Sequence, residues 1–124
     1  MKPRWNWRLA HGDARTVAGS RHAFAKALRD GGHSDDDVET GVMILGELLA
    51  NACEHGRLPV EIQLRPNGAG LVLEVVDSGA NIVRPPWRDP QSLRGRGFQI
   101  IERLGGVIEI TPRPRSIVRV TLPF

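Results

Sequence analysis

The chain has 124 residues, 40% of them hydrophobic and 25% charged, with a formal net charge of +3 and a single cysteine. These values are typical of one globular domain over residues 1–124, and one cysteine excludes an internal disulfide framework. No apolar run approaches the roughly 20 residues that cross a bilayer, and the N-terminus lacks the apolar stretch of a signal peptide. We therefore expect a cytoplasmic protein that makes no membrane contact.

The positive charge balance is compatible with nucleic-acid binding, with an anionic small ligand such as a nucleotide, or with an acidic partner protein. The 17 Lys and Arg residues are scattered and interleaved with 14 Asp and Glu residues. This mixing gives no continuous basic stripe, so we expect no nucleic-acid binding.

The N-terminal half predicts one strand and two helices. Residues 5–9 alternate between apolar and polar, as a strand does. A helix is predicted over Asp13–Arg29, with Asp13 as its N-cap and a glycine pair after it. A second helix is predicted from Ser34, a natural N-cap followed by three aspartates, to Gly56.

The C-terminal half predicts a hairpin, a long loop, a helix and two final strands. The segment "LPVEIQLR" alternates, the segment "LVLEVVD" either alternates or is buried, and the two flank the turn sequence "PNGAG". A loop rich in proline and arginine is expected from Ser78 to Arg94, and loops of this length are usually functional or disordered. The segment "GRGFQIIERLGG" predicts a helix, and "VIEIT" and "SIVRVTLPF" predict strands around "PRPR".

This order groups the helices and brings the strands in antiparallel pairs. It favours an α+β fold, a two-layer α/β sandwich, over a doubly wound parallel sheet. We expect a mixed, mostly antiparallel sheet that three helices cover on one face.

The second predicted helix carries polar residues at four-residue steps: Glu47, Asn51 and His55. Four residues advance about 400°, so each side chain lies about 40° from the last and all share one stripe. A solvated helix face explains such a stripe equally well, although asparagine is a mediocre helix former. The functional interpretation pairs a proton-accepting carboxylate with a carboxamide oxygen, the kind of ligand that Mg²⁺ prefers.

Two further segments carry residues that could bind a ligand. Asp77 ends an apolar strand, where it is either a turn former or an acceptor for an exocyclic amine such as that of adenine. Gly79 would then allow close approach of the backbone to the base. The residues Gly95-Arg96-Gly97 open a helix, and backbone N–H groups at such a start bind anions. Neither a dinucleotide fingerprint nor a P-loop is present.

The segments "ELLANACEHG", "DSGA" and "GRGFQII", in this order, resemble the N box and the two glycine boxes of one ATPase superfamily. That superfamily includes the ATP domains of gyrase, heat-shock chaperones and histidine kinases. Within it, the chain looks most like the anti-sigma-factor serine/threonine kinases of bacteria. The resemblance covers nearly the whole chain and implies a Bergerat-type ATP-binding fold.

The resemblance also implies roles for individual residues. Glu47 matches the presumed general base, and Asn51 matches the Mg²⁺ ligand. Asp77 matches the aspartate that holds the adenine amine, and Gly79 matches the first glycine of the first glycine box.

The second glycine box lies close to the phosphates in the superfamily. Gly95 and Gly97 match its glycines. From their charge and position, Arg94 and Arg96 are expected to help neutralise the phosphates.

The implied function is that of an ATP- and Mg²⁺-dependent protein kinase. It would bind and inhibit a sigma factor and phosphorylate a small antagonist protein of the anti-sigma factor; homodimers are common in this subfamily. The alternative is a non-catalytic or nucleotide-gated module of the same fold that binds a regulatory partner. Asn81, in place of a second box glycine, and three prolines in the following loop favour this alternative.

Overall fold

Eight elements follow one another in the order that the sequence predicts. The computed structural model describes residues 5–54, 58–77, 94–111 and 117–124, with only the backbone path for Asp77 and for Arg94–Arg96. The elements are β1 (Trp5–Leu9), α1 (Ala14–Asp30), α2 (Asp35–Glu54), β2 (Val60–Asn67), β3 (Gly70–Asp77), α3 (Arg94–Arg103), β4 (Val107–Thr111) and β5 (Ile117–Thr121).

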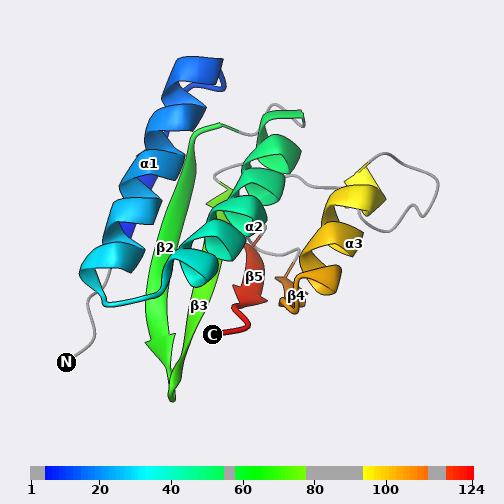
Figure 1. Ribbon diagram of the computed structural model, residues 1–124. Coiled ribbons are helices and arrows are strands. Elements are labelled where there is room, and N and C mark those ends of the chain that lie inside the picture. The colour runs from blue at the N-terminus through cyan, green and yellow to red at the C-terminus, as the bar shows by residue number, and fades with distance from the viewer. Residues whose placement is uncertain (1–4, 55–57, 78–93, 112–116) are drawn as a thin grey trace.

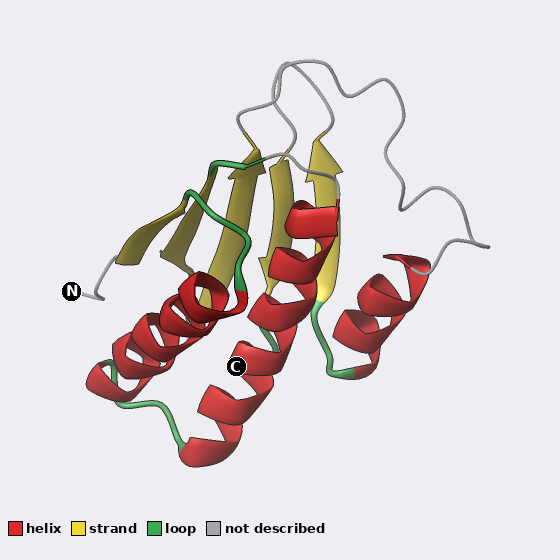
Figure 2. Cartoon of the chain, turned by 90° about the horizontal axis from the view of Figure 1, so that it is seen from above, coloured by secondary structure: helices red, strands yellow, loops and turns green. Residues whose placement is uncertain are grey.

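The strands form one five-stranded sheet in the order β1-β2-β3-β5-β4. All four neighbouring pairs are antiparallel. The three helices lie side by side on one face of this sheet, with α2 between α1 and α3 (Figures 1 and 2). The predicted two-layer α+β fold is confirmed, and the described sheet is antiparallel throughout.

Both predicted helix caps are present. The Asp13 carboxylate accepts hydrogen bonds from the hydroxyl and the backbone N–H of Thr16, at 2.6 and 3.3 Å. These bonds, the hydroxyl first, lower the pKa of Asp13 from its usual value. The Ser34 hydroxyl accepts from the N–H of Asp37 at 3.2 Å. Each cap satisfies an amide at the start of a helix that would otherwise lack a partner, so the cap sequences fix where α1 and α2 begin.

The hairpin differs slightly from its prediction. β2 continues through Pro66 and Asn67, and the connection shrinks to Gly68 and Ala69. Gly68 has a φ of +62°, which a tight two-residue connection requires. Pro66 fits in this strand because β1 pairs with β2 only as far as Leu64, so no second neighbour needs an N–H from the proline.

The core lies between the helices and the sheet. Its fully buried side chains come from every layer and include Phe24 of α1, Leu45 and Leu49 of α2, and Leu73 of β3. Gly41 sets the spacing of the first two helices: a Cβ there would lie 2.8 Å from Cδ1 of Leu28. A side chain at this position would push α1 away from α2, so the close pairing depends on glycine.

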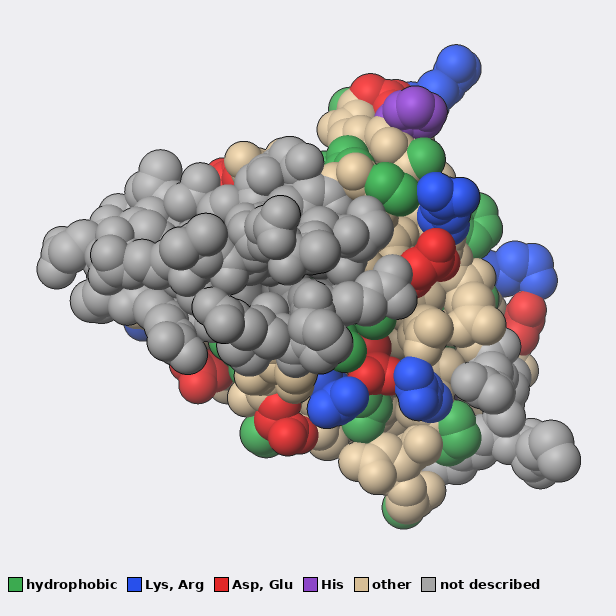
Figure 3. Space-filling view, turned by 180° about the vertical axis from the view of Figure 1, so that it is seen from behind, with side chains coloured by type: hydrophobic (Ala, Val, Ile, Leu, Met, Phe, Trp, Pro, Cys, Tyr) green, Lys and Arg blue, Asp and Glu red, His purple; other side chains and the backbone are tan. Residues whose placement is uncertain are grey.

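The opposite face of the sheet carries charged pairs, as the view from behind shows (Figure 3). Glu74 is only 3% exposed there. Its Oε2 accepts hydrogen bonds from Nη2 and Nε of Arg119, at 2.7 and 3.0 Å. Its Oε1 lies 2.6 Å from Nε of Arg65, but the angle is not that of a hydrogen bond. Two guanidinium groups thus compensate one buried carboxylate.

Candidate functional site

The polar stripe of α2 faces neither bulk solvent nor the core. Glu47 and Asn51 are both half-buried, while Leu48 and Leu49, beside them in sequence, are buried in the core. α2 packs against α1 on one side and against α3 on the other. The two polar residues therefore lie near helix–helix contacts, and a purely solvated face does not describe them.

Asn51 has a buried oxygen that lacks a partner among the described residues. Its Oδ1 is buried and accepts no hydrogen bond from any residue that the structure describes. A buried polar atom left unpaired costs about 1–3 kcal/mol, so its retention requires an explanation. A carboxamide oxygen in this state suits a hard cation, which prefers oxygen ligands.

Glu47 meets the start of α3. A Cβ built on Gly97 would lie 3.0 Å from Oε1 of Glu47 and 3.8 Å from its Cβ. Gly97 lies in the first turn of α3, which begins at Arg94. Glu47 and Gly97, far apart in sequence, thus lie close together, with no room for a side chain between them.

The backbone of Asp77 lies at the same end of the sandwich as Asn51. Asp77 is the last residue of β3 and pairs with Val60, the first residue of β2. Val60 follows closely after the end of α2 at Glu54. The end of β3 therefore lies beside the start of β2, and the start of α3 lies beside Glu47 of α2.

Several predicted site residues are described only in part. Gly79 lies outside the described residues, as does His55. Arg94, Gly95 and Arg96 form the first turn of α3 by their backbone, without a description of their side chains. The loop predicted up to Arg94 was wrong at this end, because the helix already includes that residue.

No group of three His, Cys, Asp or Glu side chains able to hold a metal occurs within the described ranges. A cation at Asn51 would therefore not be held by a cluster of three such side chains from these ranges. This fits Mg²⁺, which usually takes one or two protein ligands and completes its shell with phosphate oxygens and water.

Cys53 lies two residues beyond Asn51 and is half-buried. Burial raises the pKa of its thiol. A thiol held in its neutral form is a poor nucleophile, so Cys53 is better explained as a small packing residue. Its Sγ would lie 3.2 Å from a Cβ at Gly12, so it packs beneath the turn before α1.

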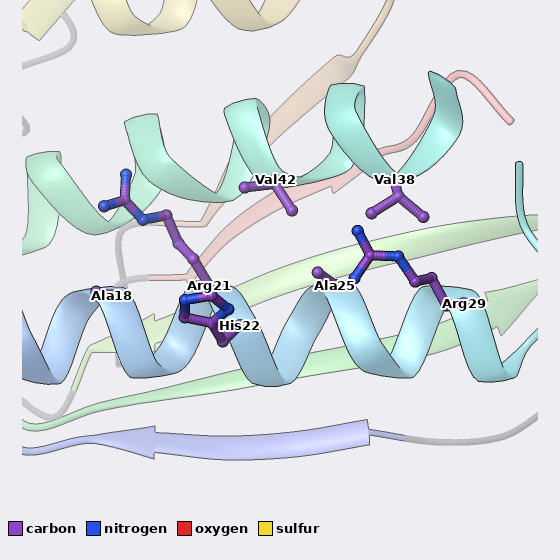
Figure 4. A pocket seen from close by; sticks show the side chains of 7 residues that line it. All are labelled: Ala18, Arg21, His22, Ala25, Arg29, Val38 and Val42. Carbon is purple, nitrogen blue, oxygen red and sulfur yellow. The ribbon is translucent and has the colours of Figure 1, made fainter. Parts of the chain in front are cut away.

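A groove of about 360 Å³ lies between α1 and the first half of α2, away from the predicted site (Figure 4). Its floor is apolar, and three cationic or titratable side chains of α1 line it. The lining residues are Ala18, Arg21, His22, Ala25, Arg29, Val38 and Val42. No site was predicted at this groove. The sequence pattern that indicates it is the spacing that puts four residues on one face of the helix: Arg21, His22, Ala25 and Arg29.

Residues 11–122 match the sequence profile of the histidine kinase-like ATPase domain family. The chain belongs to this family. The match includes all the predicted site residues. It confirms the superfamily that the three sequence boxes indicated.

Solved structures share the fold of this ATPase-like domain. One is the histidine kinase domain of the blue-light activated histidine kinase of Erythrobacter litoralis EL346, with 20% identity and a TM-score of 0.53. The match covers 86% of this chain and 60% of that one, so this chain spans less than two thirds of the kinase structure. Another belongs to the SiaB–SiaC complex of Pseudomonas aeruginosa, with 12% identity, a TM-score of 0.56, and coverage of 97% and 88%. At these identities the likeness shows the fold alone.

Among curated proteins, no sequence gives a significant match. In the part of the chain that the structure describes, no helix of this ATPase-like domain has the length and apolar character needed to cross a membrane.

Proposed function

We propose that this domain binds ATP with Mg²⁺ and transfers the terminal phosphoryl group to a serine or threonine of a small antagonist protein. Through that antagonist, and through direct binding, it regulates a sigma factor. The contact of Glu47 with Gly97, one helical turn from the unpaired oxygen of Asn51, carries the proposal. At this place a base (Glu47), a cation ligand (Asn51) and a helix N-terminus that can bind an anion (the start of α3) lie together.

The residues present fit the nucleotide and its metal. Oδ1 of Asn51 would hold Mg²⁺, which when bound neutralises charge on the phosphates. The free N–H groups in the first turn of α3, Arg94–Gly97, would donate hydrogen bonds to phosphate oxygens. Asp77 would accept a hydrogen bond from the adenine amine.

Glu47 acts as the general base in this proposal. Its carboxylate accepts the proton of the attacking hydroxyl while the hydroxyl oxygen bonds to the terminal phosphorus. The bond from that phosphorus to the bridging oxygen breaks, and ADP leaves with the electron pair. Such transfers depend mainly on positioning and on charge stabilisation, and a positioned base contributes about 10²–10⁴-fold.

The test of the proposal is a pair of measurements on the purified protein. Saturating ATP with Mg²⁺ should raise the melting temperature, because a ligand that binds only the folded state stabilises it. Labelled ATP should then pass its label to an antagonist protein encoded beside this chain. An unchanged melting temperature would contradict nucleotide binding, and binding without any label transfer would contradict the kinase step.

The second candidate function is a non-catalytic or nucleotide-gated module that grips a regulatory partner. The cationic groove between α1 and α2 favours it, because an apolar floor edged by Arg21 and Arg29 complements an acidic amphipathic segment. The similarity in fold to a component of the SiaB–SiaC complex supports a protein partner. Calorimetry that finds tight ATP binding without hydrolysis or transfer would favour this function.

Reversing charge in the groove separates partner binding from nucleotide binding. We expect Arg21→Glu with Arg29→Glu to weaken binding of an acidic antagonist about 10-fold or more, with a steeper loss at low salt. Nucleotide affinity should stay unchanged, because the groove lies away from Glu47 and Asn51. The matched control is Arg15→Glu, an exposed position of α1 outside the groove. Equal binding by the groove variant and the control would show that the partner docks elsewhere.

A further inference from the structure

Gly97 is an unfavourable residue for its local structure. It lies in the first turn of α3, where glycine is less favourable than alanine by up to about 1 kcal/mol, the value for a helix interior. The described glycines with a positive φ are Gly32, Gly68 and Gly105, so Gly97 is not there to provide a left-handed backbone. A residue that breaks a local rule without a local reason indicates a functional constraint.

The constraint is the carboxylate of Glu47. The atom nearest to a Cβ at Gly97 is Oε1 of Glu47, at 3.0 Å, and the other two near atoms, Cβ and Cδ, belong to the same side chain. Such a distance is shorter than ordinary van der Waals contact. The obstacle is the tip of a flexible side chain, so a methyl group at Gly97 would displace the carboxylate and leave the helices in place.

Other helical glycines of this chain behave differently. Gly19 of α1 has open space where a Cβ would stand. Gly41 of α2 has core carbons around it, among them Cδ1 of Leu28 at 2.8 Å. Of these three, only Gly97 faces an ionisable side chain that the proposed reaction uses.

We infer that Gly97 is a positioning residue for the base: its missing side chain leaves the space in which the Glu47 carboxylate is held. This inference rests on the proposed function and deepens it. It gives Gly97 a role that differs from contacting phosphates. A phosphate contact would use the backbone N–H, which every residue except proline has, whereas space for Glu47 requires glycine.

The inference predicts opposite effects of one substitution on stability and on turnover. Gly97→Ala should raise the melting temperature or leave it unchanged, because alanine favours the helix. Its kcat for phosphoryl transfer should fall about 3- to 10-fold, since shifting a reacting group by 1 Å costs about 10²-fold and the carboxylate shifts by less. The dissociation constant for ATP with Mg²⁺ should stay within about twofold. Gly19→Ala, the matched control, should gain stability and keep full turnover.

A spectroscopic measurement tests the contact itself. In protein with ¹³C-labelled glutamate, the carboxyl signal of Glu47, assigned by its loss in Glu47→Gln, should move in Gly97→Ala and stay in place in Gly19→Ala. In a Glu47→Gln background, Gly97→Ala should cause no further loss of rate, because the base through which it acts is already gone.

The outcomes separate this inference from the proposed function. If wild-type protein binds no nucleotide, the proposed function fails. If the carboxyl signal of Glu47 also stays in place in Gly97→Ala, the inference about Gly97 fails as well. If wild-type protein transfers phosphate and Gly97→Ala keeps its full kcat, the inference alone is overturned. A loss of kcat that is equally large in the Glu47→Gln background also overturns it, since Gly97 would then act on the phosphates.

Discussion

Glu47→Gln should abolish phosphoryl transfer while nucleotide binding survives. Glutamine keeps the shape of the side chain against Gly97 but cannot accept the hydroxyl proton as a carboxylate does. Because a positioned base contributes about 10²–10⁴-fold, kcat should fall by that factor. Calorimetry should find nearly unchanged affinity for ATP with Mg²⁺. Retained binding with lost turnover assigns Glu47 to the chemical step, as the resemblance implied.

The matched control for this prediction is Glu39→Gln. Glu39 is an exposed acid of the same helix, two turns before Glu47 and outside the site. The Glu39→Gln substitution removes the same charge from α2, so it tests whether the net charge of the helix, and not the position of Glu47, affects phosphoryl transfer. Normal label transfer by Glu47→Gln, or an equal loss in Glu39→Gln, would show that the base assignment is wrong.

Asn51→Leu should strengthen the fold and weaken the site. Leucine has the same branched arrangement of heavy atoms as asparagine, although its two methyl groups make it larger, and the half-buried position leaves room on its exposed side. It also favours a helix more, and it removes the buried oxygen that has no partner among the described residues. The free energy of unfolding should rise by about 1–2 kcal/mol, read from chemical denaturation. At the same time, the gain in nucleotide affinity caused by Mg²⁺ should drop about 10- to 100-fold, the value of an interaction with a charged group.

To test this prediction, the dissociation constant of the nucleotide is measured with Mg²⁺ and with a chelator, for both the wild type and Asn51→Leu. Asn51→Asp is the control, because it keeps an oxygen at the same place and should retain the Mg²⁺ dependence. If Asn51→Leu destabilises the protein, the oxygen has a partner that matters for folding. If the Mg²⁺ dependence survives in Asn51→Leu, the cation is held by other residues.

The sequence predicted the elements well where local chemistry decides them. Asp13 and Ser34 cap their helices as expected, since a cap depends on residues within one turn. The alternation in β2 placed Val60, Ile62 and Leu64 in the core, whereas Leu71–Val75 of β3 are buried without alternation. The ends were less accurate: β2 runs through Pro66, and α3 already includes Arg94. Contacts with a neighbouring strand or helix determine where such elements end, and the pattern of a single sequence does not show those contacts.

The sequence predicted which residues share one helix face, and it did not predict their contacts. The four-residue spacing of Glu47 and Asn51 fixed their common stripe, because helix geometry is regular. That Gly97 touches Glu47 depends on how α3 packs against α2, a tertiary fact. Glu74 was missed for the same reason: its burial depends on Arg65 and Arg119 from two neighbouring strands.

The placement of Glu47 and Gly97 on two different helices has a consequence for heat inactivation. α3 is the shortest helix, and its firmly buried side chains within the described residues are Phe98 and Ile101. Elements with few core anchors open locally at a lower free energy than the whole fold does. Warming should therefore separate Gly97 from Glu47, the two sides of the proposed site, while the hairpin and α2 are still ordered. Phosphoryl transfer would then be lost some degrees below the temperature at which the sheet melts.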